Sequence, residues 1–273
     1  MILVTGANGN LGSAVLASLK QRGATATGGS RTPGAGMRRL DFDDPAGLDL
    51  VGVDTLVLVS AGYAEDDRVV RRHRAVLDAA VRDGVRHVVY TSLTGAGDHL
   101  GFALAHRVTE RLLRASGLSW TVLRNGLYAE LFGALLTWSV DGALNSPFGD
   151  GALAAVVRGD LAEAAAVVAA APGSHGGRTY ELVGAPVTAA DVAARLGVPL
   201  RDVDLEAYRG GLLSAEGLLP FQPPMLVSLA TAVRHGFLAG TAPDLASLLG
   251  RAPHSPLPAV VACAVPSRSS PRP

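Results

Sequence analysis

Short apolar runs alternate with longer amphipathic stretches over the first half of the chain. Residues 2–5 and 55–61 are continuous runs of apolar and small residues, typical of strands that are covered on both faces. Between such runs, apolar residues recur every three or four positions, which is the period of an amphipathic helix. This alternation predicts an α/β fold with a doubly wound, Rossmann-type parallel sheet. The expected strands are residues 2–5, 24–28, 37–40, 55–61, 86–92 and 119–124, and the expected helices are 11–22, 66–82 and 103–115.

The second half of the chain has a different pattern. A helix is expected at 160–171, a strand at 178–183 and a helix at 187–196. From residue 205 to 249 the pattern predicts short helices, broken at Gly210-Gly211 and at three prolines, Pro220, Pro223 and Pro224. We interpret this part as a small, mostly helical C-terminal lobe.

Composition narrows the class of protein. The 273 residues carry 24 Lys plus Arg and 24 Asp plus Glu, so no global charge would attract nucleic acid or an anionic membrane. One cysteine, Cys263, excludes a disulfide framework and a cysteine-based zinc site. No stretch reaches the ~18 apolar residues of a membrane span, and no signal peptide is expected. A cytoplasmic location follows as the default expectation.

A glycine-rich turn between the first strand and the first helix is the strongest local signal. Residues 5–12 read TGANGNLG, with glycines at Gly6, Gly9 and Gly12. In a dinucleotide site the first glycine allows the turn, the second admits a pyrophosphate, and the third lets the helix pack closely. The helix N-terminus then supplies N–H groups to the phosphates. This context favours a nucleotide site over a purely structural turn.

The end of the second strand indicates which nucleotide binds. NAD sites usually carry an acidic residue there for the ribose 2′-hydroxyl, but residues 28–32 read GGSRT. Arg31 is placed to meet a 2′-phosphate with its planar guanidinium, which favours NADP over NAD; the alternative is a solvated loop residue. Asp41, after the third strand, is a candidate for the adenine or simply a turn residue.

The basic residues exclude one catalytic arrangement. Lys20 is the only lysine and lies in the first helix, so the Tyr-x-x-x-Lys pair of short-chain reductases cannot exist here. The basic stretch 68–74, RVVRRHR, has helical spacing and is interpreted as a solvated helix face and not a nucleic-acid site.

The chain resembles the NmrA-like atypical short-chain dehydrogenase/reductases, and among them the NAD(P)H:quinone oxidoreductase type 2 subfamily. The resemblance runs from about residue 2 to residue 264 and is carried by TGANGNLG (5–12), YTSL (90–93), LRNGLYAE (123–130), TYELVG (179–184) and LLGRAPHSPL (248–257). It implies a Rossmann domain with a small C-terminal lobe and a substrate held between them. The implied domains are an NADP-binding domain at 1–172, with 126–150 contributing to the substrate lobe, the lobe itself at 173–265, and a disordered tail at 266–273.

The resemblance also implies NADP(H) as the cofactor, with no flavin or metal. The residues it assigns to cofactor binding are Gly6, Asn8, Gly9, Asn10, Leu11, Gly12 and Arg31, with Ser60 and Ala61 near the ribose and nicotinamide. Ser60 and Ala61 end the fourth strand, and Ser92 ends the fifth, where ligands of open α/β sheets bind. For Ser92, a cap or turn hydroxyl is an equal alternative.

Three residues are candidates for the chemistry. His106 falls where related NmrA-like reductases carry an active-site lysine, and its spacing to Glu110 puts both on one helix face. It is a candidate to donate to the nicotinamide ribose or to a reduced oxygen, or else a satisfied crevice histidine. Asn125 and Tyr128 follow the sixth strand and are candidates to hold a carbonyl or amide and to cover a planar substrate. Their alternatives are a helix cap and core packing.

We therefore expect an NADPH-dependent oxidoreductase that passes hydride to a quinone or similar carbonyl acceptor. The alternatives are an NADP(H)-binding redox sensor without catalysis, and a reductase of azo dyes, triphenylmethane dyes or enones. The expected partner is a small quinone-like acceptor, without nucleic acid or membrane, and the protein is a candidate homodimer.

Overall fold

The computed structural model describes residues 1–61 and 64–265, in two compact units. Unit 1 comprises Met1–Asn125, Arg158–Leu182 and Ala242–Pro253. Unit 2 comprises Gly126–Val157, Val183–Thr241 and the segment from His254. The chain therefore leaves unit 1 after residue 125 and returns to it twice, whereas the sequence interpretation assigned 173–265 wholly to the small lobe. The tail predicted at 266–273 lies outside the described residues.

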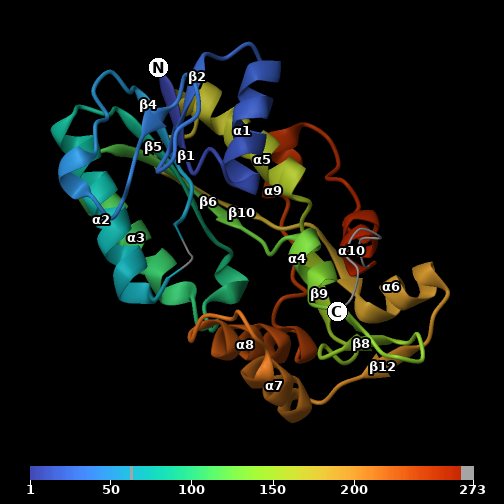
Figure 1. The fold of residues 1–273 in the computed structure, drawn as a ribbon. Coiled ribbons are helices and arrows are strands. Elements are labelled where there is room, and N and C mark those ends of the chain that lie inside the picture. Colours follow the sequence, from blue (N-terminus) through green and yellow to red (C-terminus); the bar gives the residue numbers. More distant parts are fainter. Residues whose placement is uncertain (62–63, 266–273) are drawn as a thin grey trace. The chain divides into compact units, whose positions relative to one another are not determined.

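A seven-stranded sheet, with every adjacent pair parallel, forms the centre of unit 1 (Figure 1). Its strand order is β10-β6-β5-β4-β1-β2-β3, so the chain reverses direction across the sheet on either side of β1. The inner strands β4 and β5 are wholly buried, which explains their continuous apolar runs. The strands are β1 (Ile2–Thr5), β2 (Ala26–Ser30), β3 (Arg38–Arg39), β4 (Thr55–Leu58), β5 (His87–Leu93), β6 (Ser119–Asn125) and β10 (Arg178–Leu182).

Helices cover both faces of this sheet. In Figure 1, α2 and α3 lie on one face, and α1 and α5 lie together on the other, with α9 beside α5. These helices are α1 (Asn10–Gln21), α2 (Asp66–Arg82), α3 (Ala103–Ala115), α5 (Arg158–Ala170) and α9 (Asp244–Leu249). The sandwich confirms the predicted doubly wound fold, and the bounds of α2 and α3 agree with the helical periodicity.

Unit 2 is built from five helices and two small sheets among the described residues. One sheet pairs β9 with β11 and the other has the order β12-β8-β7. The predicted lobe is mostly helical as expected, but its strands were not foreseen. The elements are α4 (Ala129–Ala134), α6 (Ala189–Leu196), α7 (Leu205–Ser214), α8 (Gln222–Arg234), α10 (Leu257–Ala264), β7 (Thr137–Trp138), β8 (Leu144–Ser146), β9 (Ala152–Ala155), β11 (Ala185–Thr188) and β12 (Leu200–Asp202).

Two local features of unit 2 test the predicted helix breaks. Helix α7 continues through Gly210-Gly211, begun by Asp204, whose Oδ1 accepts the Ala207 amide at 2.7 Å. Pro223 and Pro224 lie in the first turn of α8, where a missing N–H removes no helical hydrogen bond. The predicted break at the glycine pair is therefore wrong, whereas the predicted break at the prolines is confirmed, because α7 ends at Ser214 and α8 begins at Gln222, with Pro220 between them.

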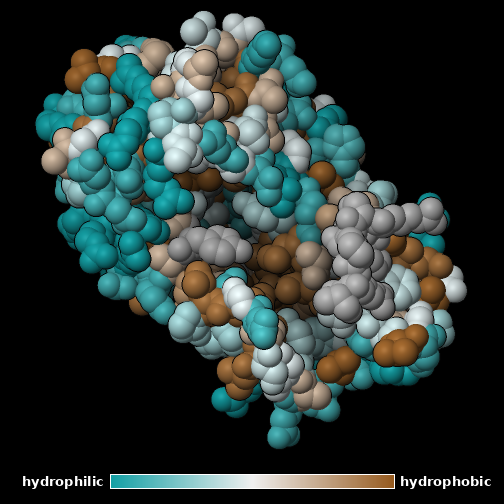
Figure 2. All heavy atoms as spheres, viewed as in Figure 1, coloured by the Kyte–Doolittle hydropathy of each residue, from teal (hydrophilic) through white to brown (hydrophobic). Residues whose placement is uncertain are grey.

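The surface over α2 and α3 is mostly hydrophilic in Figure 2. This agrees with the exposed arginines Arg71 and Arg74 of the basic stretch. Within the ranges 1–61 and 64–265, no helix combines the length and the apolar composition needed to cross a membrane.

Candidate functional site

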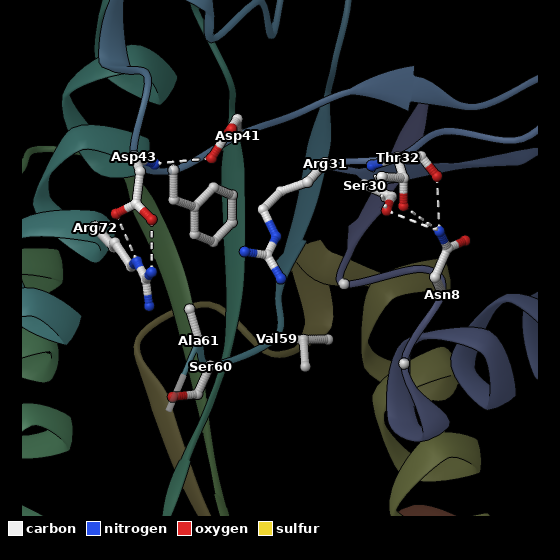
Figure 3. A pocket seen from close by; sticks show the side chains of 13 residues that line it. Asn8, Ser30, Arg31, Thr32, Asp41, Asp43, Val59, Ser60, Ala61 and Arg72 are labelled. Carbon is white, nitrogen blue, oxygen red and sulfur yellow. Dashed lines mark hydrogen bonds and ion pairs between the residues drawn. The ribbon is translucent and has the colours of Figure 1, made fainter. Parts of the chain in front are cut away.

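A pocket of about 770 Å³ opens at the carboxyl ends of β1, β2 and β4 in unit 1. These three strands flank the position where the chain reverses across the sheet, which is where open α/β sheets bind ligands. The lining residues are Gly6, Asn8, Gly9, Ser30, Arg31, Thr32, Asp41, Phe42, Asp43, Val59, Ser60, Ala61 and Arg72 (Figure 3).

The glycine turn has the geometry of a phosphate cradle. Gly6 adopts φ +62°, a conformation that other residues rarely take, and its carbonyl accepts the Gly9 amide at 2.8 Å. A Cβ on Gly12 would clash with the Gly6 carbonyl oxygen, so only glycine lets α1 start this close to β1. The exposed Gly6 and Gly9 leave the start of α1 open for an anionic group.

Small residues in β2 allow the turn to pack against the neighbouring strand. A Cβ on Gly28 would lie 2.7 Å from the Ala7 Cβ, and one on Gly29 would clash with the Leu40 side chain. The few large residues in this strand therefore reflect close packing, and β2 runs from Ala26 to Ser30, which places Arg31 directly after it.

Asn8 ties the glycine turn to the loop that carries Arg31. Its Nδ2 donates to Ser30 Oγ at 2.9 Å and to the Thr32 carbonyl at 2.8 Å. Arg31 is exposed, and among the described residues no carboxylate pairs with it. In Figure 3 its side chain extends into the pocket, between the Asn8 cluster and the Asp41–Asp43 segment. A fixed loop therefore presents an uncompensated guanidinium to the pocket.

An ion pair forms the opposite wall. Arg72 Nε and Nη2 donate to the two carboxylate oxygens of Asp43 at 2.8 and 2.6 Å. The hydrogen bonds from Arg72, with the charges of Arg72 and Arg68, lower the pKa of Asp43 to about 2. Arg72 comes from the stretch interpreted as a solvated helix face, but only 13% of its side chain is exposed. No local sequence signal marks this pair, because its members are far apart in the chain.

Ser92 belongs to a buried network and not to the pocket wall. Its hydroxyl donates to Glu110 Oε1 at 2.7 Å, and both residues are buried. Glu110 also pairs with Arg107, Arg114 and Arg124. Burial would raise the pKa of Glu110, but hydrogen bonds from Arg124 and Ser92 and the arginine charges outweigh it and lower the pKa to about 2. This arrangement leaves the Ser92 hydroxyl committed to Glu110 and favours the alternative of a structural hydroxyl.

His106 contacts Tyr90 on β5. The Tyr90 hydroxyl lies 3.0 Å from His106 Nδ1. Although His106 and Glu110 share α3, the bonds of Glu110 described above go to Ser92 and to three arginines and not to His106. Burial, with the nearby Arg107 charge, lowers the pKa of His106 to about 4, so the ring is neutral near pH 7.

Asn125 ends β6, and its buried Oδ1 has no hydrogen-bond partner among the described residues. A buried amide oxygen without a hydrogen-bond donor costs free energy, unless a ligand donates a hydrogen bond to it. Tyr128 lies in unit 2, where its carbonyl accepts the Leu131 and Phe132 amides at the start of α4. The main chain of Tyr128 therefore caps α4, and its side chain is half-buried.

The pocket therefore brings together seven of the predicted cofactor residues. These are Gly6, Asn8, Gly9, Arg31, Asp41, Ser60 and Ala61. The predicted residues that do not line it are Asn10, Leu11 and Gly12 at the start of α1, with Ser92, His106, Asn125 and Tyr128. The sequence interpretation missed Phe42, Asp43, Val59, Arg72 and the hydroxyls of Ser30 and Thr32.

Comparison with known proteins agrees with this geometry. The family described as NAD(P)H-binding matches residues 6–131. Quinone oxidoreductase 2 of Escherichia coli is 37% identical over 199 residues, covering 67% of this chain and 68% of that protein. An NmrA-like family domain-containing oxidoreductase of Aspergillus flavus, flvB, is 34% identical over 59% of this chain and 58% of that protein.

Solved structures give the same result over the full length. The NADPH complex of the E. coli NADPH-dependent quinone oxidoreductase superposes with a TM-score of 0.83 at 31% identity, covering 95% of this chain and 98% of that one. The NADP(H) complex of the triphenylmethane reductase of a Citrobacter species has a TM-score of 0.84 at 28% identity, covering 97% and 100%. The chain therefore belongs to the NAD(P)H-binding, NmrA-like oxidoreductase family that includes quinone oxidoreductase 2.

Proposed function

We propose that this protein is an NADPH-dependent oxidoreductase that reduces a quinone or a similar carbonyl acceptor. The observation that carries the choice of cofactor is the unpaired Arg31 guanidinium, held at the pocket by the Asn8 contacts. The relatives' names support the choice of acceptor, since one reduces quinones and another triphenylmethane compounds.

The residues present fit a dinucleotide. Gly12 lets α1 start close to β1, Gly6 and Gly9 are exposed at the pocket, and among the described residues no carboxylate pairs with Arg31. The buried Asn125 Oδ1 lacks a donor, and the amide of a nicotinamide would supply one. When bound, NADPH supplies the hydride, and the protein orients the ring and excludes water.

We assign His106 and Asn125 of unit 1 to the substrate, and Tyr128 of unit 2 is a separate candidate. A half-buried, neutral His106 that accepts from the Tyr90 hydroxyl at Nδ1 would carry its proton on Nε2 and would donate a hydrogen bond there. Asn125 would orient an amide or carbonyl, and Tyr128 would cover a planar acceptor. A quinone accepts hydride readily, so a tyrosine–lysine pair is not required.

Steady-state turnover tests the proposal. We expect purified protein to oxidise NADPH rapidly only when a benzoquinone or naphthoquinone is added, and to oxidise NADH far more slowly. Tight NADPH binding without turnover on any acceptor would contradict catalysis and favour a redox sensor. The cytoplasmic location and a homodimer stay predictions.

A further inference from the structure

The segment that follows β4 is held by side chains and not by the sheet. The β4 ladder ends at Leu58, and Val59–Ala61 then continue along the pocket wall. Each of their three successive amides donates to a side chain from a different element: Val59 to Thr5 Oγ1 at 2.9 Å, Ser60 to Thr91 Oγ1 at 3.0 Å, and Ala61 to His73 Nε2 at 2.9 Å.

The imidazole of His73 has a defined tautomer. An amide can only donate, so Nε2 is the acceptor and carries no proton. Nδ1 lies 2.8 Å from Thr109 Oγ1, whose own hydrogen is donated to the Ala105 carbonyl, so Nδ1–H donates to Thr109. The ring thus joins α2, α3 and the pocket wall with both nitrogens satisfied.

This arrangement uses a residue that is expensive to bury. His73 is fully buried, and burial, with the charges of His106 and Arg72, lowers its pKa to about 3. An apolar side chain would fill the same position of α2 without a desolvation cost, but it would leave the Ala61 amide unpaired. Among the described residues, the group that Nε2 of the imidazole pairs with is the amide of Ala61, which lines the pocket.

We propose that His73 is a positioning residue of the cofactor pocket, which fixes Ser60 and Ala61 for the cofactor by accepting the Ala61 amide. Thr91 does the same for the Ser60 amide. The inference rests on the proposed NADPH site, and it is independent of the acceptor. The side chains of His73 and Thr91 do not line the pocket, so both residues act through the main-chain amides that they bind.

Two substitutions at His73 separate positioning from simple stability. His73→Gln places an oxygen where Nε2 lies and keeps an acceptor for Ala61, but loses the bond to Thr109. His73→Asn keeps a donor near Thr109 and loses the acceptor for Ala61. We expect both variants to lose stability, and only His73→Asn to raise the Kd of NADPH, by about tenfold, the size of one unpaired amide.

A second pair covers the case in which both His73 variants fail to fold. Thr91→Val removes the acceptor of the Ser60 amide, and Thr121→Val is its control. Thr121 is also buried in the sheet. Its hydroxyl donates to the His175 carbonyl and bonds to His87 Nε2, and neither residue lines the pocket. We expect a higher NADPH Kd for Thr91→Val alone.

NADPH titration by fluorescence and urea unfolding are the two readouts. Equal Kd values for His73→Gln and His73→Asn, or for the two threonine variants, would overturn the proposal. The proposal would also be overturned if the NADPH Kd of each variant rose in proportion to its loss of free energy of unfolding. The titration contains no quinone, so it tests the role of His73 independently of the proposed reaction. A protein that binds NADPH but reduces no quinone would contradict the proposed reaction. The Kd values of the variants would still decide the role of His73.

Discussion

Replacing Glu110 with glutamine should cost far more stability than replacing an ordinary surface acid. Glu110 is 1% exposed and accepts hydrogen bonds from Ser92, Arg107, Arg114 and Arg124 at 2.7 to 3.2 Å. The amide would lose the negative charge that three guanidinium groups share. It would also point N–H donors at them.

The magnitude follows from the pKa. The pKa of Glu110 falls from 4.5 to about 2 on folding, and each pKa unit corresponds to about 1.4 kcal/mol. The ionised carboxylate therefore contributes about 3 kcal/mol to the free energy of unfolding. Because the folded pKa is depressed, this contribution is fully present above the unfolded pKa of 4.5 and is lost as the pH falls toward 2.

Urea unfolding at a series of pH values measures it. At pH 7 we expect Glu110→Gln to be less stable than the wild type by about 3 kcal/mol. The difference should be constant above about pH 5.5 and shrink below 4.5, because only the wild type takes up the proton. The control is Glu163→Gln, since Glu163 is 30% exposed and pairs with Arg22 and Arg251. We expect it to cost less than about 1 kcal/mol. A loss at Glu110 no larger than that of the control, or one that does not change with pH, would refute the reasoning.

Three further predictions concern the pocket and its surroundings. Arg31→Ala should raise the NADPH Kd by about ten- to a hundredfold, because charge-assisted bonds to the 2′-phosphate are lost, and leave the NADH Kd unchanged; equal effects on both in a titration would contradict the NADP assignment. The pH profile of kcat/KM should show no inflection near 6.5, since burial lowers the pKa of His106 to about 4; an inflection there would mean a solvated imidazole. Gly12→Ala should lower the free energy of unfolding by about 1–3 kcal/mol, because its Cβ would clash with the Gly6 carbonyl, whereas Gly159→Ala, with open space around it, should not destabilise; urea titration distinguishes them.

The periodicity of apolar residues was sufficient to predict the central sheet and its helices. The helix at 66–82 has the predicted bounds because its buried face and its acidic first turn, Asp66 and Asp67, both leave a sequence signal. The strand at 178–183 was predicted, but its partner was not: it lies beside β6 as an edge strand of the main sheet. A strand pattern specifies which face is buried and does not specify the neighbouring strand.

The candidate site was predictable where one short motif builds it. The glycine turn and Arg31 lie within one βαβ unit, so their spacing alone places them together. Arg72 and Asp43 could not be found this way, since they come from a helix and a loop and meet only in the folded chain. The same holds for His73, whose helical spacing is that of an ordinary core residue.

These missed residues share a physical cause. A parallel ladder must stop at the carboxyl edge of the sheet for a ligand to approach, and the amides and loops beyond it lose their strand partners. Here side chains replace the ladder: Asn8 holds the Arg31 loop, Arg72 holds Asp43, and His73 holds Ala61. Each of them comes from an element other than the segment it fixes, so a pocket of this kind depends on polar residues that no local motif marks. We therefore expect substitution of His73, which does not line the pocket, to weaken NADPH binding without removing a ligand contact of its own.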